Sequence, residues 1–298
     1  MSGLKKRVLV IGGSGFIGSF IVAKLKELPF IIVNVLGQHD LDGIRLGQIK
    51  PLFQLLENND SYDIVINLAA YIEDDSKKII KSNFHGVHDV LDYCNHFQVG
   101  LLIHLSRSFE VKNLGFNASS RLKNLYEYSK QYAELLLENR SKVPTKILRI
   151  TAPVWTNMPM SRYLSQILFN IAKGEPVKIF GRGKRIQNYV RLDSISDAVI
   201  ALIDSSLIES CKCYMACGPE NFSDYKFAEI VHERLGLPFN YEFISDKGVS
   251  KVDESDYSIK NPSNFSSELG IKLRYIDSDY LSSQMSVIQE NVQSGVVL

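Results

Sequence analysis

The chain has 298 residues, of which 45% are hydrophobic, and a formal net charge of +1. This is enough apolar material for one large core or two joined lobes, and the near-zero charge argues against nucleic acid or an anionic membrane surface as the main partner. No apolar run approaches the roughly 20 residues needed to cross a bilayer, no signal-peptide pattern precedes the first strand, and four cysteines do not make a disulfide framework, so we expect a cytoplasmic protein.

The first expected strand and helix are joined by a glycine-rich turn. The apolar run VLVI at 8–11 meets GGSGFIG at 12–18, which leads into an expected helix at 16–27. Gly12 allows a sharp turn out of the strand, Gly15 removes a side chain where a diphosphate approaches, and Gly18 lets the helix pack close to the strand. The helix N-terminus offers N–H groups to that diphosphate, so the turn predicts a dinucleotide site. Its expected cofactor contacts are Gly12, Ser14, Gly15, Phe16, Ile17 and Gly18.

Strand and helix patterns alternate through the rest of the first half of the chain. The expected strands are 30–36, 64–69, 101–105 and 146–150, and the expected helices are 51–58, 78–96 and 120–139. A near-continuous apolar strand such as 30–36 is typical of a parallel sheet covered on both faces. The repeated βα units predict an α/β, Rossmann-like, doubly wound parallel sheet with right-handed crossovers.

The pattern becomes less regular past residue 150. We expect helices at 163–173, 194–203 and 225–235, and a strand at 177–180. Ser223 is the expected cap of the last helix, and Gly236 its end. We interpret 1–155 as an NAD(P)-binding Rossmann domain and 156–298 as mainly a substrate-binding lobe, with about 185–220 returning to the main sheet. Cys211, Cys213, Met215 and Cys217 alternate with period two and contain no CxxC, which favours one buried face of a strand over a metal site.

Tyr126 and Lys130 are four residues apart on the expected helix 120–139 and therefore share one face. An ammonium close to a phenol favours the phenolate, which suits a group that exchanges a proton with a sugar oxygen while a nicotinamide exchanges hydride. Ser108 follows the strand 101–105 at the sheet edge where ligands bind, and its hydroxyl could contact the same oxygen. Taken singly, Tyr126 and Lys130 could lie on a surface face of the helix, and Ser108 could be a simple turn residue. Together with the glycine turn, they are the candidate catalytic residues.

These motifs together resemble the extended short-chain dehydrogenase/reductase family, in the branch of nucleotide-sugar epimerases, dehydratases and 4-ketoreductases. Matching segments are GGSGFIG at 12–18, NLAA at 67–70, Asn83 with Gly86, SRS at 106–108 and YEYSK at 126–130; IFGRG at 179–183, YVRLD at 189–193 and CGPE at 217–220 resemble later ones.

The resemblance implies a role for each matching residue. Tyr126 is the acid/base, Lys130 tunes it and holds the nicotinamide ribose, and Ser108 polarises the substrate oxygen. Asn83 supports the lysine through water. The cofactor contacts implied outside the glycine turn are Leu68, Ala69, Ala70, Asn83, Tyr126, Lys130 and Pro153.

Several positions depart from the family pattern. Dehydratases carry Thr-Asp-Glu where this chain has Ser108-Phe109-Glu110, so the acid that expels a 6-hydroxyl is missing and dehydration is disfavoured. Gln187 stands where uridine-diphosphate enzymes usually have arginine, and Arg185 or Arg191 could grip a diphosphate instead. The candidate substrate contacts are therefore Ser108, Glu110, Arg185, Gln187 and Arg191.

The sequence leaves the form of the cofactor open. No acid ends the strand 30–36; Asp40, and after it Asp42, are the first candidates to contact a ribose 2′-hydroxyl, and no arginine stands there for a 2′-phosphate. NAD and NADP both remain possible.

We expect an NAD(P)-dependent oxidoreductase or epimerase acting at C4 of a nucleotide-diphosphate sugar, by 4-keto sugar reduction or 4-epimerisation. The alternatives are a non-catalytic NAD(P)-binding sensor or scaffold and a reductase of a non-sugar carbonyl. The resemblance also implies a homodimer formed through the helices 78–96 and 120–139, whose expected outer faces carry Phe97, Leu135 and Leu136.

Overall fold

A computed structural model of the chain describes residues 5–36, 62–72, 75–108, 121–155, 162–204, 211–244 and 256–294. The chain forms two compact units. Unit 1 contains residues 1–150, 196–215 and 268–271, and unit 2 contains 151–195, 216–267 and 272–298. After residue 150, the chain therefore returns to unit 1 twice, at 196–215 and at 268–271.

Unit 1 is built on a six-stranded sheet with the order β2-β1-β3-β4-β5-β9. The adjacent strands from β2 to β5 pair in parallel; Val8, for example, lies opposite Val33 on one side and Ile64 on the other. The α/β Rossmann-like fold predicted from the sequence is confirmed. The strands are β1 (Lys6–Ile11), β2 (Ile31–Leu36), β3 (Ile64–Asn67), β4 (Leu101–Arg107), β5 (Thr145–Ile150) and β9 (Cys211–Ala216).

The strand order reverses between β1 and β3, because the chain passes from β1 outward to β2 and then returns to the other side of β1. In open α/β sheets, ligands bind beyond the carboxyl ends of the strands at this reversal point. The two segments that leave the sheet there are the glycine turn after β1 and residues 68–70 after β3. The topology therefore points to this edge as a ligand site.

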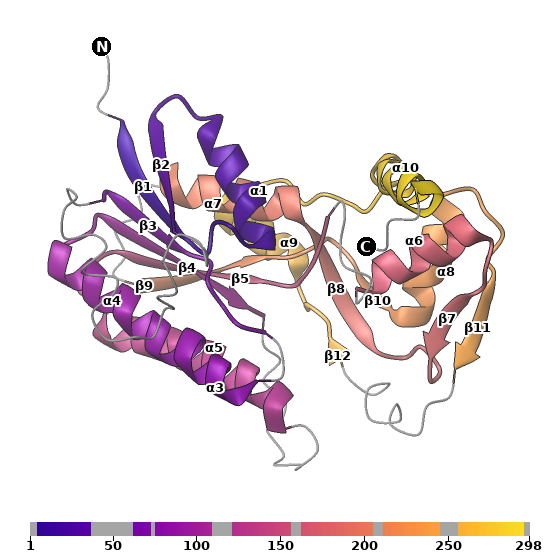
Figure 1. The fold of residues 1–298 in the computed structure, drawn as a ribbon, viewed down its shortest axis with the longest axis horizontal. Helices are drawn as coiled ribbons and strands as arrows, with labels where there is room; N and C mark the ends of the chain where they lie inside the picture. The colour runs from indigo at the N-terminus through magenta and orange to yellow at the C-terminus, as the bar shows by residue number, and fades with distance from the viewer. Residues whose placement is uncertain are drawn as a thin grey trace. The chain divides into compact units, whose positions relative to one another are not determined.

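Helices cover both faces of this sheet, with α1 and α7 on one side and α4 and α5 on the other (Figure 1). The expected helix 78–96 is realised as three consecutive segments, the middle one a π-helical turn. Residues from β1, β3, β4 and β5 form one apolar core with α4 and α5. The helices are α1 (Phe16–Lys26), α3 (Ser76–Ile79), η1 (Ile80–His85), α4 (Gly86–Phe97), α5 (Arg121–Arg140) and α7 (Leu192–Asp204).

The expected outer face of α4 and α5 is only partly exposed. Leu135 is 59% exposed. Phe97 and Leu136, in contrast, are partly buried and pack against the core. A homodimer formed through these helices stays a prediction, with Leu135 as its exposed apolar residue.

Unit 2 is organised around β8, which pairs antiparallel with β10 and parallel with β6 and β12, while β11 pairs in parallel with β7. The predicted cap of α8 is confirmed, since Ser223 Oγ accepts a hydrogen bond from Lys226 N at 3.1 Å. Gly236 follows the helix with φ +68°, the left-handed conformation of a helix end. The elements are β6 (Ala152–Val154), β7 (Val177–Phe180), β8 (Ile186–Arg191), β10 (Asn221–Ser223), β11 (Tyr241–Ile244), β12 (Asp256–Tyr257), α6 (Tyr163–Lys173), α8 (Asp224–Arg234), α9 (Pro262–Leu269) and α10 (Ser278–Ser294).

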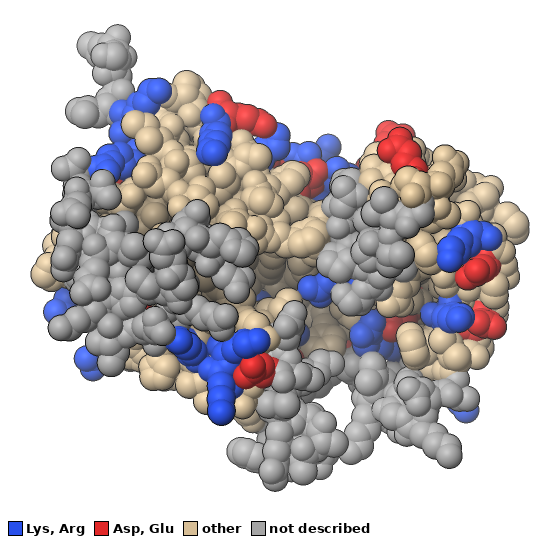
Figure 2. Space-filling view, in the orientation of Figure 1, with Lys and Arg blue, Asp and Glu red and all other residues tan. Residues whose placement is uncertain are grey.

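The described residues can also be searched for metal-binding groups, membrane-spanning helices and clusters of charge. The strand predicted around the cysteines is present as β9, but its predicted buried face is wrong: Cys211, Cys213 and Met215 are half-buried, and the buried residues are Tyr214 and Ala216 on the alternate positions. Within the described ranges, no group of three or more His, Cys, Asp or Glu side chains could hold a metal ion. Among the helices described, none is both long and apolar enough to cross a membrane. On the face drawn in Figure 2, the described basic and acidic side chains are interspersed.

Candidate active site

The glycine turn is fixed by close contacts of its backbone. Gly12 has φ +80°, and its N–H donates to Leu36 O at 2.7 Å. A Cβ at Gly12 would lie 2.7 Å from the backbone nitrogen of Ala69, and a Cβ at Gly18 would lie 2.2 Å from Gly12 O. Real Cβ atoms do not approach backbone atoms this closely. Gly12 is therefore required for the contact with the segment after β3, and Gly18 for the contact between α1 and the turn.

Gly15 has a different surrounding. Among the described residues, a Cβ there would meet only Gly12 O, at 3.2 Å. Gly15 is the exposed N-cap residue of α1 and has no side chain with which to cap it, and the first turn of this helix contains no acidic residue. The N–H groups and dipole of a helix N-terminus favour an anion. The turn thus fits the diphosphate of a dinucleotide at Gly15.

The segment after β3 borders the same turn. Leu68 N donates to Ile11 O at 2.9 Å, and Ala69 N donates to Asn67 Oδ1 at 3.2 Å. The Asn67 amide nitrogen lies 3.2 Å from His104 Nδ1 on β4. Leu68 and Ala69 are half-buried and Ala70 is exposed. These contacts hold the expected cofactor-binding residues 68–70 beside Gly12.

The three candidate catalytic residues lie around the carboxyl end of β4. Ser108 directly follows β4, and its N–H donates to Ile150 O at 2.8 Å. Lys130 Nζ donates to Leu105 O at 3.0 Å, which ties α5 to the end of β4. The Arg107 guanidinium lies 5.9 Å from the centre of the Tyr126 ring. Because Arg107 is the neighbour of Ser108, these contacts bring Ser108, Tyr126 and Lys130 to one region of unit 1.

Lys130 is unusual because its cationic side chain is almost fully buried; only 5% of the residue is exposed. Burial lowers the pKa of Lys130 to about 8, and the nearby Glu134 carboxylate acts in the opposite direction. His104 is also buried, and burial, followed by the charge of Lys130, holds its pKa well below the usual range. His104 is therefore a neutral imidazole beside the lysine.

Asn83 is buried in η1 and makes a set of hydrogen bonds with two segments. Its Nδ2 donates to Ser129 Oγ at 3.0 Å and to Tyr71 O at 2.9 Å, and its Oδ1 accepts from Tyr71 N at 2.7 Å. Ser129 Oγ in turn donates to Tyr126 O at 2.7 Å. Asn83 thus joins the chain after β3 to the helical turn that carries Tyr126 and Lys130.

In unit 2, two of the candidate substrate residues lie side by side. Arg185 forms a two-pronged ion pair with Asp224, with nitrogen–oxygen distances of 2.9 and 3.1 Å. The side-chain amide of Gln187 lies beside the same guanidinium, and its oxygen can accept from it at 2.9–3.2 Å. Asp224 and Gln187 together fix the orientation of Arg185.

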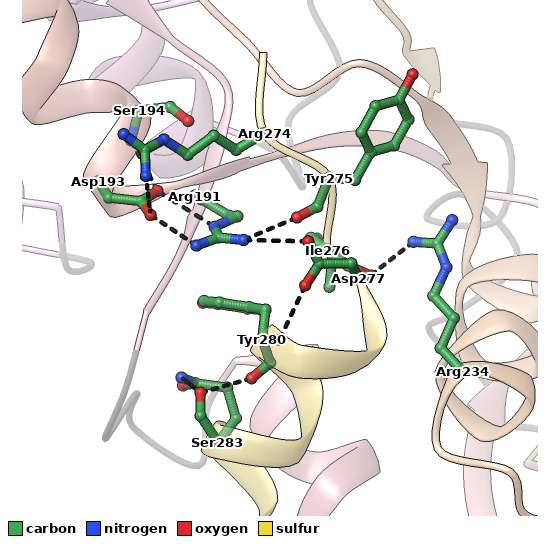
Figure 3. Close-up of polar contacts among 11 residues, drawn as sticks. Arg191, Asp193, Ser194, Arg234, Arg274, Tyr275, Ile276, Asp277, Tyr280 and Ser283 are labelled. Atoms are coloured by element: carbon green, nitrogen blue, oxygen red, sulfur yellow. Dashed lines mark hydrogen bonds and ion pairs between the residues drawn. The ribbon is translucent and has the colours of Figure 1, made fainter. Parts of the chain in front are cut away.

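Arg191 is bound to other parts of unit 2 (Figure 3). Its guanidinium pairs with Asp193 at 2.7 Å, donates to Tyr275 O at 3.1 Å and lies 3.7 Å from Asp277. It also lies 4.4 Å from the centre of the Tyr280 ring. These contacts give Arg191 a structural role in holding the segment before α10.

The remaining candidates are placed as follows. Pro153 is half-buried in β6, within unit 2. Asp40, Asp42 and Glu110 lie outside the described residues. Glu134 and Arg149, which form an ion pair next to Lys130 with a buried carboxylate and a partly exposed guanidinium, are not among the residues predicted from the sequence. Glu134 could have been found from the sequence, since it follows Lys130 by one helical turn.

Comparisons with known proteins identify the family of the chain. A model of the family described as "NAD dependent epimerase/dehydratase family" matches residues 8–209. The chain is 26% identical over 236 residues to a dTDP-D-glucose 4,6-dehydratase of Dictyostelium discoideum, covering 65% of this chain and 54% of that protein. It is 24% identical over 233 residues to Protein CapI of Staphylococcus aureus, covering 66% and 69%. The chain thus spans about half the length of the first of these relatives.

Solved structures share the fold across almost the whole chain. The UDP-glucuronic acid 4-epimerase of Bacillus cereus, in complex with UDP-glucuronic acid and NAD, has a TM-score of 0.74 at 18% identity and covers 95% of this chain and 99% of that one. The UDP-glucose 4-epimerase of Thermotoga maritima, with UDP-glucose, has a TM-score of 0.74 at 18% identity, covering 96% and 99%.

Proposed function

Because the chain belongs to the NAD dependent epimerase/dehydratase family, we propose that it acts at C4 of a nucleotide-diphosphate sugar, by 4-epimerisation or by reduction of a 4-keto sugar. One observation carries the proposal: Ser108, Tyr126 and Lys130 lie around the end of β4, in the sheet whose reversal point carries the glycine turn. A dinucleotide site and a proton-transfer group at one sheet edge are what such a reaction requires.

We propose NAD as the cofactor. The exposed N-terminus of α1 at Gly15 fits its diphosphate, and residues 68–70 border the same turn. Several structural relatives were solved with NAD, which favours it over NADP. When bound, the nicotinamide would accept hydride from the sugar or deliver hydride to it.

In this mechanism the side chains of the protein manage the proton and the substrate oxygen. The Tyr126 hydroxyl takes a proton from the 4-hydroxyl of the sugar, or returns one to a 4-keto oxygen. The Lys130 ammonium favours the phenolate of Tyr126, and the Ser108 hydroxyl donates to the same sugar oxygen. Asn83 and Ser129 fix the helical turn between the tyrosine and the lysine.

Loss of water from the sugar is not part of this proposal, although several of the similar proteins are dehydratases. The chain has Phe109 between Ser108 and Glu110, where the dehydratases that it resembles carry an aspartate. Phenylalanine cannot transfer a proton to a leaving hydroxyl. This substitution favours reactions confined to C4.

We propose that Arg185, with Gln187 beside it, contacts the substrate diphosphate. Guanidinium suits phosphate geometry, and Asp224 holds this one in a fixed orientation. Arg191 remains the alternative candidate; like Arg185 it is held by a carboxylate, that of Asp193, and it also donates to the carbonyl of Tyr275.

The test combines a substrate screen with one variant. UDP-, dTDP-, GDP- and CDP-sugars are incubated with NAD⁺ or NADP⁺, and their 4-keto forms with NADH or NADPH, while cofactor absorbance and the C4 configuration of the sugar are followed. A reductase oxidises the cofactor stoichiometrically, whereas an epimerase changes C4 with no net change in absorbance. Tyr126→Phe should bind cofactor normally and lose at least 100-fold in turnover, in line with the loss of an acid–base group. Tyr128→Phe, two residues along the same helix, is the control.

Two outcomes would refute the proposal. Unchanged turnover in Tyr126→Phe would remove its acid–base group. Binding of NAD with no reaction of any nucleotide sugar would favour the sensor or scaffold alternative, and reduction of a simple ketone without nucleotide-sugar binding would favour a reductase of non-sugar carbonyls.

A further inference from the structure

The face of α5 that carries Tyr126 and Lys130 continues, one helical turn later, to Glu134. The three residues are spaced by four, so their side chains follow one another along the helix. Only 4% of Glu134 is exposed. A carboxylate is rarely buried to this extent unless it is paired, because transfer of its charge out of water is costly. Its position next to the catalytic lysine therefore calls for an explanation.

Arg149 on β5 holds this carboxylate. Its Nε donates to both oxygens of Glu134, at 3.0 and 3.1 Å, and a second guanidinium nitrogen donates to Oε2. The side chain of Arg149 is 34% exposed, whereas that of Glu134 is 6% exposed. Solvent therefore screens the guanidinium more strongly than the carboxylate. The pair fixes Glu134 in place and leaves much of its negative charge effective toward the protein interior.

The other groups around Lys130 do not supply that negative charge. On β4, His104 is a neutral imidazole and Arg107 pairs with Glu127 at 2.9 Å. From η1, the uncharged Asn83 reaches the same turn of α5 through Ser129. Within the described residues, Glu134 is the carboxylate whose charge opposes the effect of burial on Lys130.

We propose that Glu134, fixed by Arg149, is a positioning residue that keeps the buried Lys130 ammonium charged. Burial alone favours the neutral amine, because a cation loses its hydration there. A neutral Lys130 could neither favour the phenolate of Tyr126 nor act as a cation toward the cofactor ribose, and this consequence rests on the proposed function. The effect of Glu134 on the protonation of Lys130 is independent of the proposed function.

The experiment measures that protonation directly. The protein is labelled with ¹³C and ¹⁵N at the lysine side chains, and the Lys130 signal is assigned by its loss in Lys130→Met. Glu134→Gln keeps an oxygen that can accept from Arg149 but removes the charge. We expect the proton affinity of Lys130 to fall by about tenfold in this variant, the size of effect that a nearby opposite charge exerts. Glu138→Gln, an exposed carboxylate one turn further along α5, should leave the titration unchanged.

Glu134→Asp adds a graded comparison and serves if Glu134→Gln does not fold. It keeps the charge but withdraws it by one methylene, so Lys130 should titrate at a pH between those found in the wild type and in Glu134→Gln. If Glu134→Gln does not fold, Lys130 should still titrate at a lower pH in Glu134→Asp than in the wild type. In turnover, the loss of activity at high pH should move to lower pH in the same order. A merely structural role for Glu134 would lower activity equally at every pH.

The two proposals fail separately. If Lys130 titrates in Glu134→Gln as in the wild type, or if Glu138→Gln shifts it equally, the inference about Glu134 is overturned whatever the enzyme does. If the titration shifts as expected while Tyr126→Phe keeps full turnover, the proposed function fails and the role of Glu134 in the charge of Lys130 stands.

Discussion

Two glycines of the same turn should fail in opposite ways when replaced by alanine. At Gly18, the added Cβ would lie 2.2 Å from Gly12 O and 2.8 Å from Gly13 Cα. The first contact falls 1.2 Å short of the 3.4 Å at which ordinary contacts begin. Both neighbours are backbone atoms, so α1 has to move away from the turn. At Gly15, the one atom of the described residues that the added Cβ meets is Gly12 O, at 3.2 Å, and a shift of a few tenths of an ångström relieves this contact.

The magnitudes follow from these contacts. Overpacking costs about 3 kcal/mol at the upper end of its range, and alanine in place of glycine inside a helix returns about 1 kcal/mol, which leaves Gly18→Ala about 2 kcal/mol less stable. For a chain of 298 residues, whose unfolding entropy is about 0.6 kcal/mol/K, that corresponds to a fall of about 3 °C in Tm. Gly15→Ala should stay within about 0.5 kcal/mol of the wild type. Its methyl group, however, would occupy the position where the cofactor diphosphate is proposed to approach, so cofactor binding should be lost.

Thermal unfolding followed by circular dichroism and NADH binding followed by fluorescence separate the two effects. Gly18→Ala should melt early, and Gly15→Ala should melt normally but bind NADH at least tenfold more weakly. If Gly18→Ala melts with the wild type, the close contact is not rigid. If Gly15→Ala binds NADH with full affinity, the diphosphate does not approach this residue.

Two further predictions concern the buried polar groups beneath the site. Burial lowers the pKa of Lys130 from 10.5 to about 8, so the unfolded chain binds more protons between these values; the wild type should therefore gain on the order of 3 kcal/mol relative to Lys130→Met as pH rises from about 8 to about 10.5. Urea unfolding at the two pH values measures this gain, and a constant difference would contradict it. Asn83→Ala removes the hydrogen bonds to Tyr71 and Ser129 and should lower the free energy of unfolding by about 2–3 kcal/mol, measured by urea unfolding at pH 7. A variant as stable as the wild type would show that these bonds have no net effect.

Local features were predictable from the sequence because their signals are local. The glycine turn, the apolar strands and the spacing of Tyr126 and Lys130 depend on the geometry of one strand or one helix. The fold class and the family follow from their order along the chain, and both are confirmed. The cap at Ser223 and the end of α8 at Gly236 were predictable for the same reason.

The tertiary structure decided what depends on pairing between distant segments. No periodicity in the sequence indicates that β9 joins the sheet beside β5, or that Arg149 and Glu134 meet. The same holds for Arg185 and Arg191, which look alike in sequence as phosphate ligands. In the structure, Arg191 binds the backbone of the segment before α10, and Arg185 lies between Asp224 and Gln187.

The sequence by itself thus determined a dinucleotide fold and the identity of its candidate catalytic residues, since helical and strand periods fix which residues share a face. The tertiary structure decided the electrostatic surroundings of those residues. Lys130 is buried because α5 packs against β4. The Glu134 carboxylate, held by Arg149 on β5, opposes the effect of that burial on the charge of Lys130. The charge state of the lysine depends on desolvation and on long-range partners, which exist only once the chain has folded.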